Sequence, residues 1–363
     1  MEHTLNYNDF RKKTKKLKVG NTYIGGDSNI AIQSMTNTDP HDLLATLNQV
    51  LSLQNAGCDI VRLTAPDMES AHVIGKVREN PDVKIPLVAD IHFDYRIALE
   101  CAACGVDKIR INPGNIGDKD RVRAVVNACR EKKIPIRIGV NGGSLEKEIL
   151  AEFGAPTPKA LAKSAMGHVK ILEELDFTDI VISVKSSSVY NVIKANELLS
   201  DMCDYPLHIG ITEGGGEKNG TLKASAVLGS LLMNGIGDTL RVSLTADPEK
   251  EIKCAKDILK SLGFAKSGIN IISCPTCGRT KIDLFALESQ FEKYAENLKT
   301  DKHITVAIMG CAVNGPGEAS QADIGIAGGI GEYLLFKKGE IIGKVPADFA
   351  LDALISETEK LIK

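Results

Sequence analysis

The sequence predicts an α/β protein in which a TIM-like (β/α)8 barrel is followed by a small α+β domain. Eight short apolar, β-branched segments alternate with helical patterns from residue 30 onward, and eight such units fit a closed barrel of parallel strands. From about residue 267 the rhythm changes to shorter β segments mixed with helices over 283–299 and 347–362. This change indicates a separate α+β domain.

The expected barrel strands lie in segments 30–37, 59–66, 85–93, 108–115, 135–143, 179–187, 206–216 and 238–248. Between them, stretches such as 41–57 and 220–235 have the apolar spacing of helices. A doubly wound open sheet is the main alternative, but it seldom needs eight equal units and should carry a dinucleotide-binding glycine fingerprint. We therefore expect a barrel over 1–264 and a second domain over 265–363.

Composition and charge narrow the class of protein. The 363 residues are 43% hydrophobic and 25% charged, with a net charge of -3, so no global basic surface for nucleic acid is expected. No apolar stretch approaches a membrane span and no secretory signal is evident at the N-terminus. We expect a cytoplasmic protein without a membrane or nucleic-acid partner, and we interpret the cationic run 11–18 as a solvated segment.

Cations recur on one face of four expected strands. Because side chains alternate along a strand, residues two or four apart share a face. A barrel interior is normally apolar, and an unpaired buried cation costs on the order of several kcal/mol. The pattern favours an anionic, phosphate-bearing ligand, although pairing with Asp90 or Glu213, or a place in water at the rim, would also explain any single cation. The same-face pairs are Arg110 with Asn112, Arg137 with Asn141, Lys185 with Ser183, and Arg241 with Ser243.

Two glycine-rich segments, 141–144 and 212–216, follow the fifth and seventh expected strands. Their backbone NH groups could approach a phosphate closely, but glycine after a strand is also ordinary turn chemistry. Asp90 and His92 share a face at the end of the third strand, and Glu213 ends the seventh. These three residues are candidates for acid–base roles.

Three of the nine cysteines follow strands of the second domain. Cys274 and Cys277 form a C-x-x-C motif after one apolar strand, and Cys311 follows the next. Sets of thiolates bind zinc or iron-sulfur clusters. His303 begins the strand that precedes Cys311, roughly 26 Å away, so Glu318 is the remaining local donor and favours an iron site with one displaceable ligand. The other cysteines are interpreted as core residues: Cys58, Cys101, Cys104, Cys129, Cys203 and Cys254.

Six motifs together resemble a known family, the bacterial 4-hydroxy-3-methylbut-2-enyl diphosphate synthases of non-mevalonate isoprenoid biosynthesis. The resemblance covers essentially the whole chain. The two C-terminal motifs in this order are highly specific, whereas each barrel motif alone is weak. The motifs are I-Q-S-M-T-N-T (32–38), V-A-D-I-H-F (88–93), R-I-N-P-G-N (110–115), T-E-G-G (212–215), S-C-P-T-C-G-R (273–279) and C-A-V-N-G-P-G-E (311–318).

This resemblance implies an iron-sulfur oxidoreductase that opens 2-C-methyl-D-erythritol 2,4-cyclodiphosphate and removes a hydroxyl. It implies one 4Fe-4S cluster per chain, two one-electron steps, and flavodoxin or ferredoxin as the electron donor. It also implies a head-to-tail homodimer in which the cluster domain of one subunit covers the barrel of the other. A phosphate-binding barrel with a structural zinc site is the alternative, and it leaves the missing fourth soft ligand unexplained.

The resemblance also implies roles for individual residues. Cys274, Cys277, Cys311 and Glu318 would be the cluster ligands, and Glu213 would be the proton donor. Catalytic candidates are Glu213, Glu318, Asp90 and His92. The implied substrate-binding residues are Arg62, Arg110, Asn112, Arg137, Asn141, Lys185, Thr212, Arg241 and Ser243.

Overall fold

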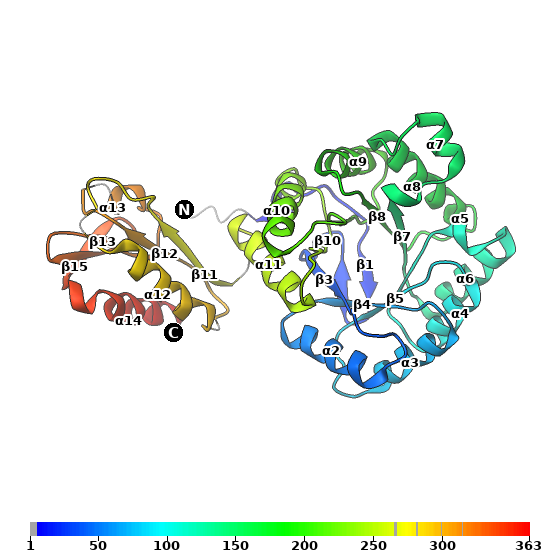
Figure 1. Ribbon diagram of the computed structural model, residues 1–363, viewed down its shortest axis with the longest axis horizontal. Helices are drawn as coiled ribbons and strands as arrows, with labels where there is room; N and C mark the ends of the chain where they lie inside the picture. Colours follow the sequence, from blue (N-terminus) through cyan, green and yellow to red (C-terminus); the bar gives the residue numbers. More distant parts are fainter. Residues whose placement is uncertain (1–5, 265–266, 281, 299, 314) are drawn as a thin grey trace. The chain divides into compact units, whose positions relative to one another are not determined.

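The computed structural model divides the chain into two compact units, Met1–Leu262 and Gly263–Lys363 (Figure 1). It describes residues 6–264, 267–280, 282–298, 300–313 and 315–363. The expected boundary between residues 264 and 265 falls at the edge of a pair, 265–266, that lies outside the described residues. Each unit has its own sheet.

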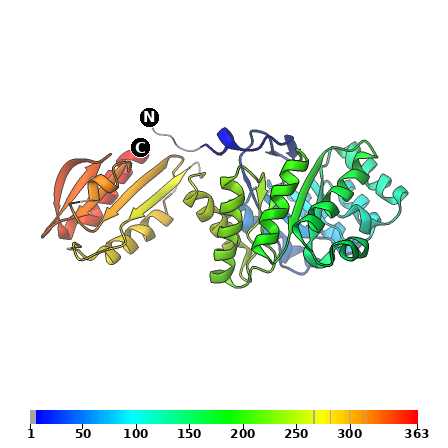
Figure 2. The same ribbon diagram turned by 90° about the horizontal axis from the view of Figure 1, so that it is seen from above.

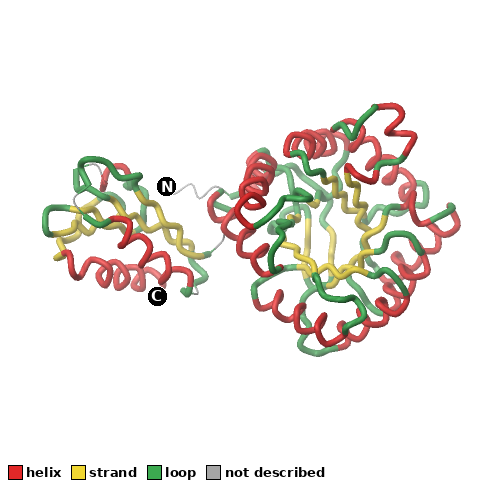
Figure 3. Tube along the Cα trace, viewed as in Figure 1, coloured by secondary structure: helices red, strands yellow, loops and turns green. Residues whose placement is uncertain are grey.

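The first unit contains the expected ring of eight parallel strands, which confirms the barrel. Neighbours in the sequence pair with one another, and the last strand pairs with the first. Between β8 and β9 the ring closes through a parallel bridge from Ile182 to Leu207. Figure 3 shows these strands surrounded by helices. The strands are β3 (Ala31–Met35), β4 (Ile60–Thr64), β5 (Leu87–Asp90), β6 (Lys108–Ile111), β7 (Ile136–Asn141), β8 (Ile180–Lys185), β9 (His208–Ile209) and β10 (Thr239–Leu240).

Aspartates begin several of the helices that surround the barrel. The side chains of Asp42, Asp67, Asp94 and Asp118 each accept a hydrogen bond from a backbone NH in the first turn of the helix that follows. Such N-caps satisfy NH groups that have no partner inside the helix. The helices of this unit are α1 (Tyr7–Phe10), α2 (Leu43–Asn55), α3 (Met68–Glu79), α4 (Tyr95–Ala103), α5 (Pro113–Ile116), α6 (Lys119–Lys132), α7 (Lys147–Phe153), α8 (Pro158–Glu173), α9 (Val189–Met202), α10 (Glu217–Met233) and α11 (Pro248–Ser261).

A β-hairpin that the sequence patterns did not predict precedes the barrel strands. It consists of β1 (Leu17–Val19) and β2 (Thr22–Ile24). Its three apolar side chains are buried in one cluster with Ala31, Ile60, Val88 and Val181, which stand at the beginnings of barrel strands. The hairpin therefore packs against the N-terminal end of the barrel core, and Figure 2 shows the N-terminal segment in dark blue at one end of the barrel.

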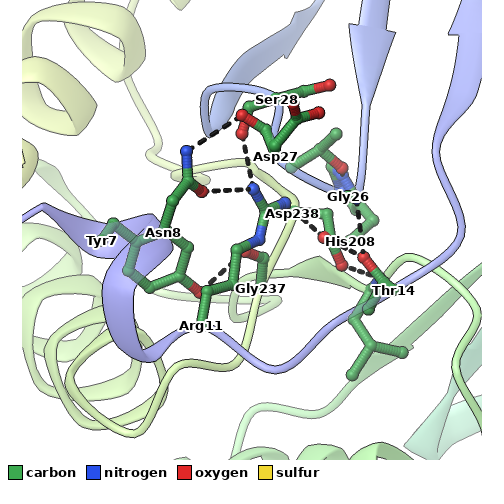
Figure 4. A network of polar contacts seen from close by, with 12 residues as sticks. Tyr7, Asn8, Arg11, Thr14, Gly26, Asp27, Ser28, His208, Gly237 and Asp238 are labelled. Carbon is green, nitrogen blue, oxygen red and sulfur yellow. Dashed lines mark hydrogen bonds and ion pairs between the residues drawn. The ribbon is translucent and has the colours of Figure 1, made fainter.

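Arg11 is buried, so the interpretation of residues 11–18 as a solvated segment is wrong at this position. Its guanidinium forms an ion pair with the buried carboxylate of Asp238, immediately before β10 (Figure 4). Asp238 also accepts hydrogen bonds from the Thr14 hydroxyl at 2.7 Å and from the Leu207 backbone NH at 2.6 Å. This network ties the N-terminal segment to the seam between β9 and β10.

The second unit is an α+β domain with a five-stranded sheet in the order β11-β12-β13-β14-β15. β11, β12 and β13 are parallel, whereas β14 and β15 are antiparallel. Leu284 and Phe291 of α12 and Leu354 of α14 belong to one buried cluster with strand residues. The elements are β11 (Gly268–Ser273), α12 (Leu284–Glu296), β12 (His303–Met309), α13 (Gly315–Glu318), β13 (Ile324–Gly328), β14 (Glu332–Lys337), β15 (Glu340–Pro346) and α14 (Ala350–Ile362). Among the described residues, no helix combines the length and apolar character needed to cross a bilayer.

Replacing Asp238 with alanine tests the N-terminal network. The substitution leaves the Arg11 charge buried without its carboxylate, so we expect the free energy of unfolding to fall by about 3–5 kcal/mol. Asp201→Ala is the matched control, because Asp201 pairs with Lys12 on the surface and such pairs contribute less than about 1 kcal/mol. Urea denaturation measures both variants. Equal losses would mean that the buried pair does not hold the seam.

Candidate functional site

Five cations come from β4, β6, β7, β8 and the residue after β10: Arg62, Arg110, Arg137, Lys185 and Arg241. Arg110, Arg137 and Lys185 are at most 6% exposed, and Arg62 and Arg241 are partly buried. Arg110 lies opposite Arg137 in the pairing of β6 with β7. Burial, followed by repulsion from neighbouring cations, holds the pKa of Arg137 and of Lys185 well below the usual values. The structure thus gathers positive charge where barrels normally hold apolar side chains.

Asp90, at the end of β5, is a buried carboxylate that balances part of this charge. It forms an ion pair with Arg62, and Arg110 Nη1 lies 3.3 Å from its Oδ1. Burial alone would raise its pKa, but the two guanidinium groups outweigh this effect and hold the pKa of Asp90 at about 2. Asp90 is therefore an anion that fixes two arginines, and it is poorly suited to take up a proton.

Glu251 of α11 balances a third cation, and sequence reasoning missed it. Its carboxylate receives two hydrogen bonds from Arg241, at 3.1 and 3.2 Å, and another from the Ser34 hydroxyl at 2.9 Å. Its position in the helical pattern could have identified it, because Glu251 lies on the same buried face of α11 as Ala255 and Ile258. A carboxylate on such a face requires a partner.

Arg137 and Lys185 differ from the other three cations. No carboxylate within the described part of the chain pairs with either side chain, and Arg137 Nε and Nη2 have no hydrogen-bond partner there. The alternative explanation, pairing with acidic residues, thus holds for Arg62, Arg110 and Arg241. It does not hold for these two, and an anion entering the barrel would find their donors available.

Two glycines, Gly139 in β7 and Gly210 directly after β9, lie where neighbouring groups come close to the backbone. A side chain at Gly139 would place its Cβ 2.4 Å from Arg110 Nε, and one at Gly210 would place it 2.3 Å from the Arg241 carbonyl oxygen. The Gly139 NH donates to Asn112 Oδ1 at 2.9 Å, which holds that amide in place. Glycine is therefore required at position 139 by the approach of the Arg110 guanidinium, and at position 210 by the Arg241 backbone and a φ of +152°.

The remaining barrel candidates lie at the end of β7 or just after β5, β9 and β10. His92 is half-exposed, with Nε2 3.8 Å from Asp90 Oδ2. Glu213 is exposed and adopts a left-handed backbone conformation with φ +56°. Its neighbour Thr212 is partly buried, and the glycine-rich loop that follows lies against Ser243, whose carbonyl would be 2.8 Å from a Cβ on Gly214. Asn141 ends β7 and opens the other glycine-rich segment, a short 3-10 turn.

The cysteines of the second unit follow strands that end at the same edge of the sheet. Ser273 of β11 pairs with Ile308 of β12, so Cys274 and Cys311 follow parallel, neighbouring strands. The Gly310 NH donates to Cys274 Sγ at 3.1 Å. Soft thiolate donors at one edge suit iron or zinc.

Arg279 links the other cluster candidates. Hydrogen bonds from its backbone and its guanidinium lower the pKa of the exposed Cys277 thiol. The same guanidinium interacts electrostatically with Cys311 and with Glu318 of α13. In the described ranges, no three histidine, cysteine or acidic side chains converge as a group able to hold a metal ion.

The other six cysteines lie in the barrel unit, as expected for core thiols. Four are buried and two are partly buried. Burial raises the pKa of Cys58, Cys101 and Cys129 to about 12, which keeps these thiols protonated. They are therefore poor ligands and poor nucleophiles.

The ion pairs of Asp90 predict a pH-dependent contribution to stability. Its pKa is depressed in the folded state, so the contribution of about 2–3 kcal/mol is present above pH 4 and lost as the pH falls from 4 to 2. The difference in unfolding free energy between wild type and Asp90→Asn should shrink over this range in urea denaturation. Asp82→Asn, in an exposed turn, changes a surface residue that contributes little to stability, so its difference from wild type should stay near zero over the same range. A difference that does not depend on pH would contradict the assignment.

Two family models match the chain, and they correspond to the two units. The model described as the GcpE TIM-barrel domain matches residues 14–256, and the GcpE protein C-terminal domain matches residues 270–360. Similar proteins named 4-hydroxy-3-methylbut-2-en-1-yl diphosphate synthase (flavodoxin) occur in Ruminiclostridium cellulolyticum, Clostridium perfringens and Geobacter sulfurreducens. They are 57%, 57% and 53% identical over 97% of this chain and 98%, 99% and 99% of their own lengths. Both domains, in the same order and over nearly the full length, place this chain in the GcpE family.

Proposed function

We propose that this chain catalyses the reductive opening of 2-C-methyl-D-erythritol 2,4-cyclodiphosphate to 4-hydroxy-3-methylbut-2-enyl diphosphate. The main support for this proposal comes from the barrel interior, which contains five cations. Two of them, Arg137 and Lys185, have no carboxylate partner among the described residues. A cyclic diphosphate supplies the missing negative charge. The relatives named above carry the corresponding activity in their names.

The reaction balances with two electrons and one proton. The ring bond between carbon and the phosphate oxygen breaks, the neighbouring hydroxyl leaves as water, and a carbon–carbon double bond forms between the two carbons. The cyclic dianion becomes a linear diphosphate trianion. Glu213 is the proposed proton donor. It is an exposed carboxylate in the glycine-rich loop that lies against Ser243.

The cations have distinct tasks in this proposal. Arg137 and Lys185 bind the diphosphate directly, with the Ser243 hydroxyl and the backbone NH groups of 212–216 as further donors. Arg62 and Arg110 are held in position by Asp90, and Arg241 by Glu251. Because these carboxylates fix the arginines before the substrate enters, binding requires little rearrangement of the side chains. Asn112, Asn141, Thr212 and His92 line the same site.

The donor set at the edge of the second sheet suits an iron-sulfur cluster. Cys274, Cys277 and Cys311 would supply thiolates, and Glu318 would supply a carboxylate to the remaining iron. When bound, a 4Fe-4S cluster supplies the two electrons one at a time. The contact of Gly310 NH with Cys274 Sγ and the Arg279 guanidinium near Cys277 place donors around the sulfurs, and such donors favour the thiolate state.

The electron donor and the assembly are part of the same proposal. The names of the relatives specify flavodoxin, and we propose flavodoxin, or a ferredoxin in its place, as the donor to this chain. We also propose the head-to-tail homodimer implied by the resemblance. The zinc-stapled binding protein is the weaker candidate, since a structural zinc site would need a fourth soft ligand and would give the barrel no reaction to perform.

The test is anaerobic oxidation of reduced viologen by the cluster-loaded protein with and without the cyclodiphosphate. We expect oxidation that depends on substrate and yields the linear diphosphate, because the cations select this substrate class. Protein that carries an intact cluster and does not oxidise viologen with this substrate would overturn the assignment. A colourless protein with one zinc per chain would favour the zinc-stapled alternative.

Replacing Arg137 with methionine tests the binding site itself. The change removes two unpartnered donors without leaving a buried charge, so the fold should remain while substrate affinity falls by roughly 10- to 150-fold. Arg123→Met is the matched control, because Arg123 is exposed on α6 and pairs with Asp120. Calorimetric titration of both variants with the cyclodiphosphate measures the change. Unchanged affinity in Arg137→Met would place the diphosphate elsewhere.

A further inference from the structure

Beneath the five cations lies a layer of polar side chains that the proposed chemistry does not use. It consists of Lys108, two residues before Arg110 on β6, together with Gln33 of β3 and His208 of β9. All three are at most 1% exposed. Lys108 Nζ, both amide atoms of Gln33 and His208 Nε2 have no hydrogen-bond partner within the described residues. Buried polar atoms in proteins are normally satisfied, so this layer requires an explanation.

Among the described residues, no carboxylate is available to pair with Lys108. Asp90 is engaged with Arg62 and Arg110, and Glu251 with Arg241. In the pairing of β5 with β6, Lys108 lies opposite the apolar Val88. The hairpin contributes the apolar Leu17, Val19 and Ile24 to the core below. The charged groups that act on Lys108 are Arg137 and Arg62, and Lys108 itself acts on His208. The other charged groups of the barrel interior are Asp90, Arg110, Lys185 and Arg241, with Glu251 paired to Arg241.

A protonated Lys108 is therefore unfavourable in the empty barrel. Burial first, and then repulsion from Arg137 and Arg62, lowers the pKa of Lys108 to about 7. Burial, and then repulsion from Lys185 and Arg137, also lower the pKa of His208 well below its ordinary value, so this ring stays neutral. It is fixed by a 2.8 Å hydrogen bond between Nδ1 and the Thr239 hydroxyl. Lys108 is thus the group of the layer whose charge can change near neutral pH.

We propose that Lys108 takes up a proton from solvent when an anionic diphosphate binds to the cations above it, so that above neutral pH the site gains a positive charge on binding. This inference rests on the proposed function, because it assumes that a diphosphate enters the barrel. The step is the conversion of a lysine amine and one solvent proton to an ammonium, and no substrate bond changes. The bound anion reverses the local field, since it attracts the charge that Arg137 and Arg62 repel.

The charge of Lys108, below the proposed diphosphate site, would therefore change with occupancy of that site. A permanently charged Lys108 would add repulsion to the empty barrel, where Arg137 and Lys185 already have no carboxylate partner among the described residues. A neutral amine avoids this repulsion, and it contributes attraction once the diphosphate is present. Lys108 is accordingly a positioning and charge-compensating residue, one layer below the groups proposed to touch the substrate.

Calorimetric titration tests the proposal directly. Anaerobic, cluster-loaded protein is titrated with the cyclodiphosphate without reductant, so that binding occurs without turnover. Runs in two buffers with different ionisation enthalpies give the number of protons taken up. We expect close to one proton at pH 8 and little at pH 6, where Lys108 is already protonated. Both phosphates of the ligand are strongly acidic diesters, so the ligand does not titrate in this range.

The pH dependence of affinity gives an independent readout with a defined sign. Because protons are taken up on binding, affinity should fall as the pH rises, by about tenfold per pH unit above 7. In Lys108→Met both the proton uptake and this slope should be lost. Lys132→Met, the same change at an exposed lysine at the end of α6, should behave like wild type. Lys108→Gln gives a second neutral variant, and thermal melting establishes that each variant is folded.

The outcomes separate this inference from the proposed function. Binding by wild type without proton uptake at pH 8 overturns the role of Lys108 and leaves the substrate assignment intact. Uptake that persists undiminished in folded Lys108→Met or Lys108→Gln assigns the proton to another group and also overturns it. Wild-type protein that does not bind the cyclodiphosphate in either buffer removes the substrate assignment and this inference together.

Discussion

The ion pairs of Asp90 with Arg62 and Arg110 are the interaction on which the barrel interior depends. A buried carboxylate normally tends to become neutral, but here two guanidinium groups keep it ionised. In return, Asp90 holds both arginines, which lie on β4 and β6, the strands on either side of β5. Glu251 does the same for Arg241 from α11. These two carboxylates neutralise only part of the positive charge in the interior. The proposed anionic substrate would neutralise the rest.

The geometry that supports these pairs comes from the N-terminal segment as well as from the strands. β9 and β10 are the shortest barrel strands, with two residues each, so their backbone ladder alone holds the seam weakly. Asp238 strengthens it by binding Leu207 NH on one side and Arg11 and Thr14 on the other. The hairpin fills the N-terminal end of the core with apolar side chains, and the polar interior then faces the other end, where loops carry Glu213 and Ser243.

The second unit uses a simpler arrangement. Parallel strands bring their following loops to the same edge of the sheet, and the chain places Cys274 and Cys311 after neighbouring strands there. The short helix α13 carries Glu318, and Arg279 interacts with this carboxylate and with two of the cysteines. Such donors around the sulfurs would tune the iron-sulfur cluster that we propose for this edge.

The sequence by itself determined the repeating strands, the change of domain near residue 265, and the residues that the motifs single out. These features follow from local periodicity. The prediction that each of Arg110, Arg137, Lys185 and Arg241 shares a strand face with a polar residue follows from the two-residue repeat of a strand. Only the tertiary structure decided the pairing of charges. Asp90 could have neutralised any of the cations, and Glu251 lies on a helix, so sequence spacing could not assign either. The burial of Arg11 was likewise invisible, because its partner Asp238 is more than two hundred residues away and a contact of that range leaves no local pattern.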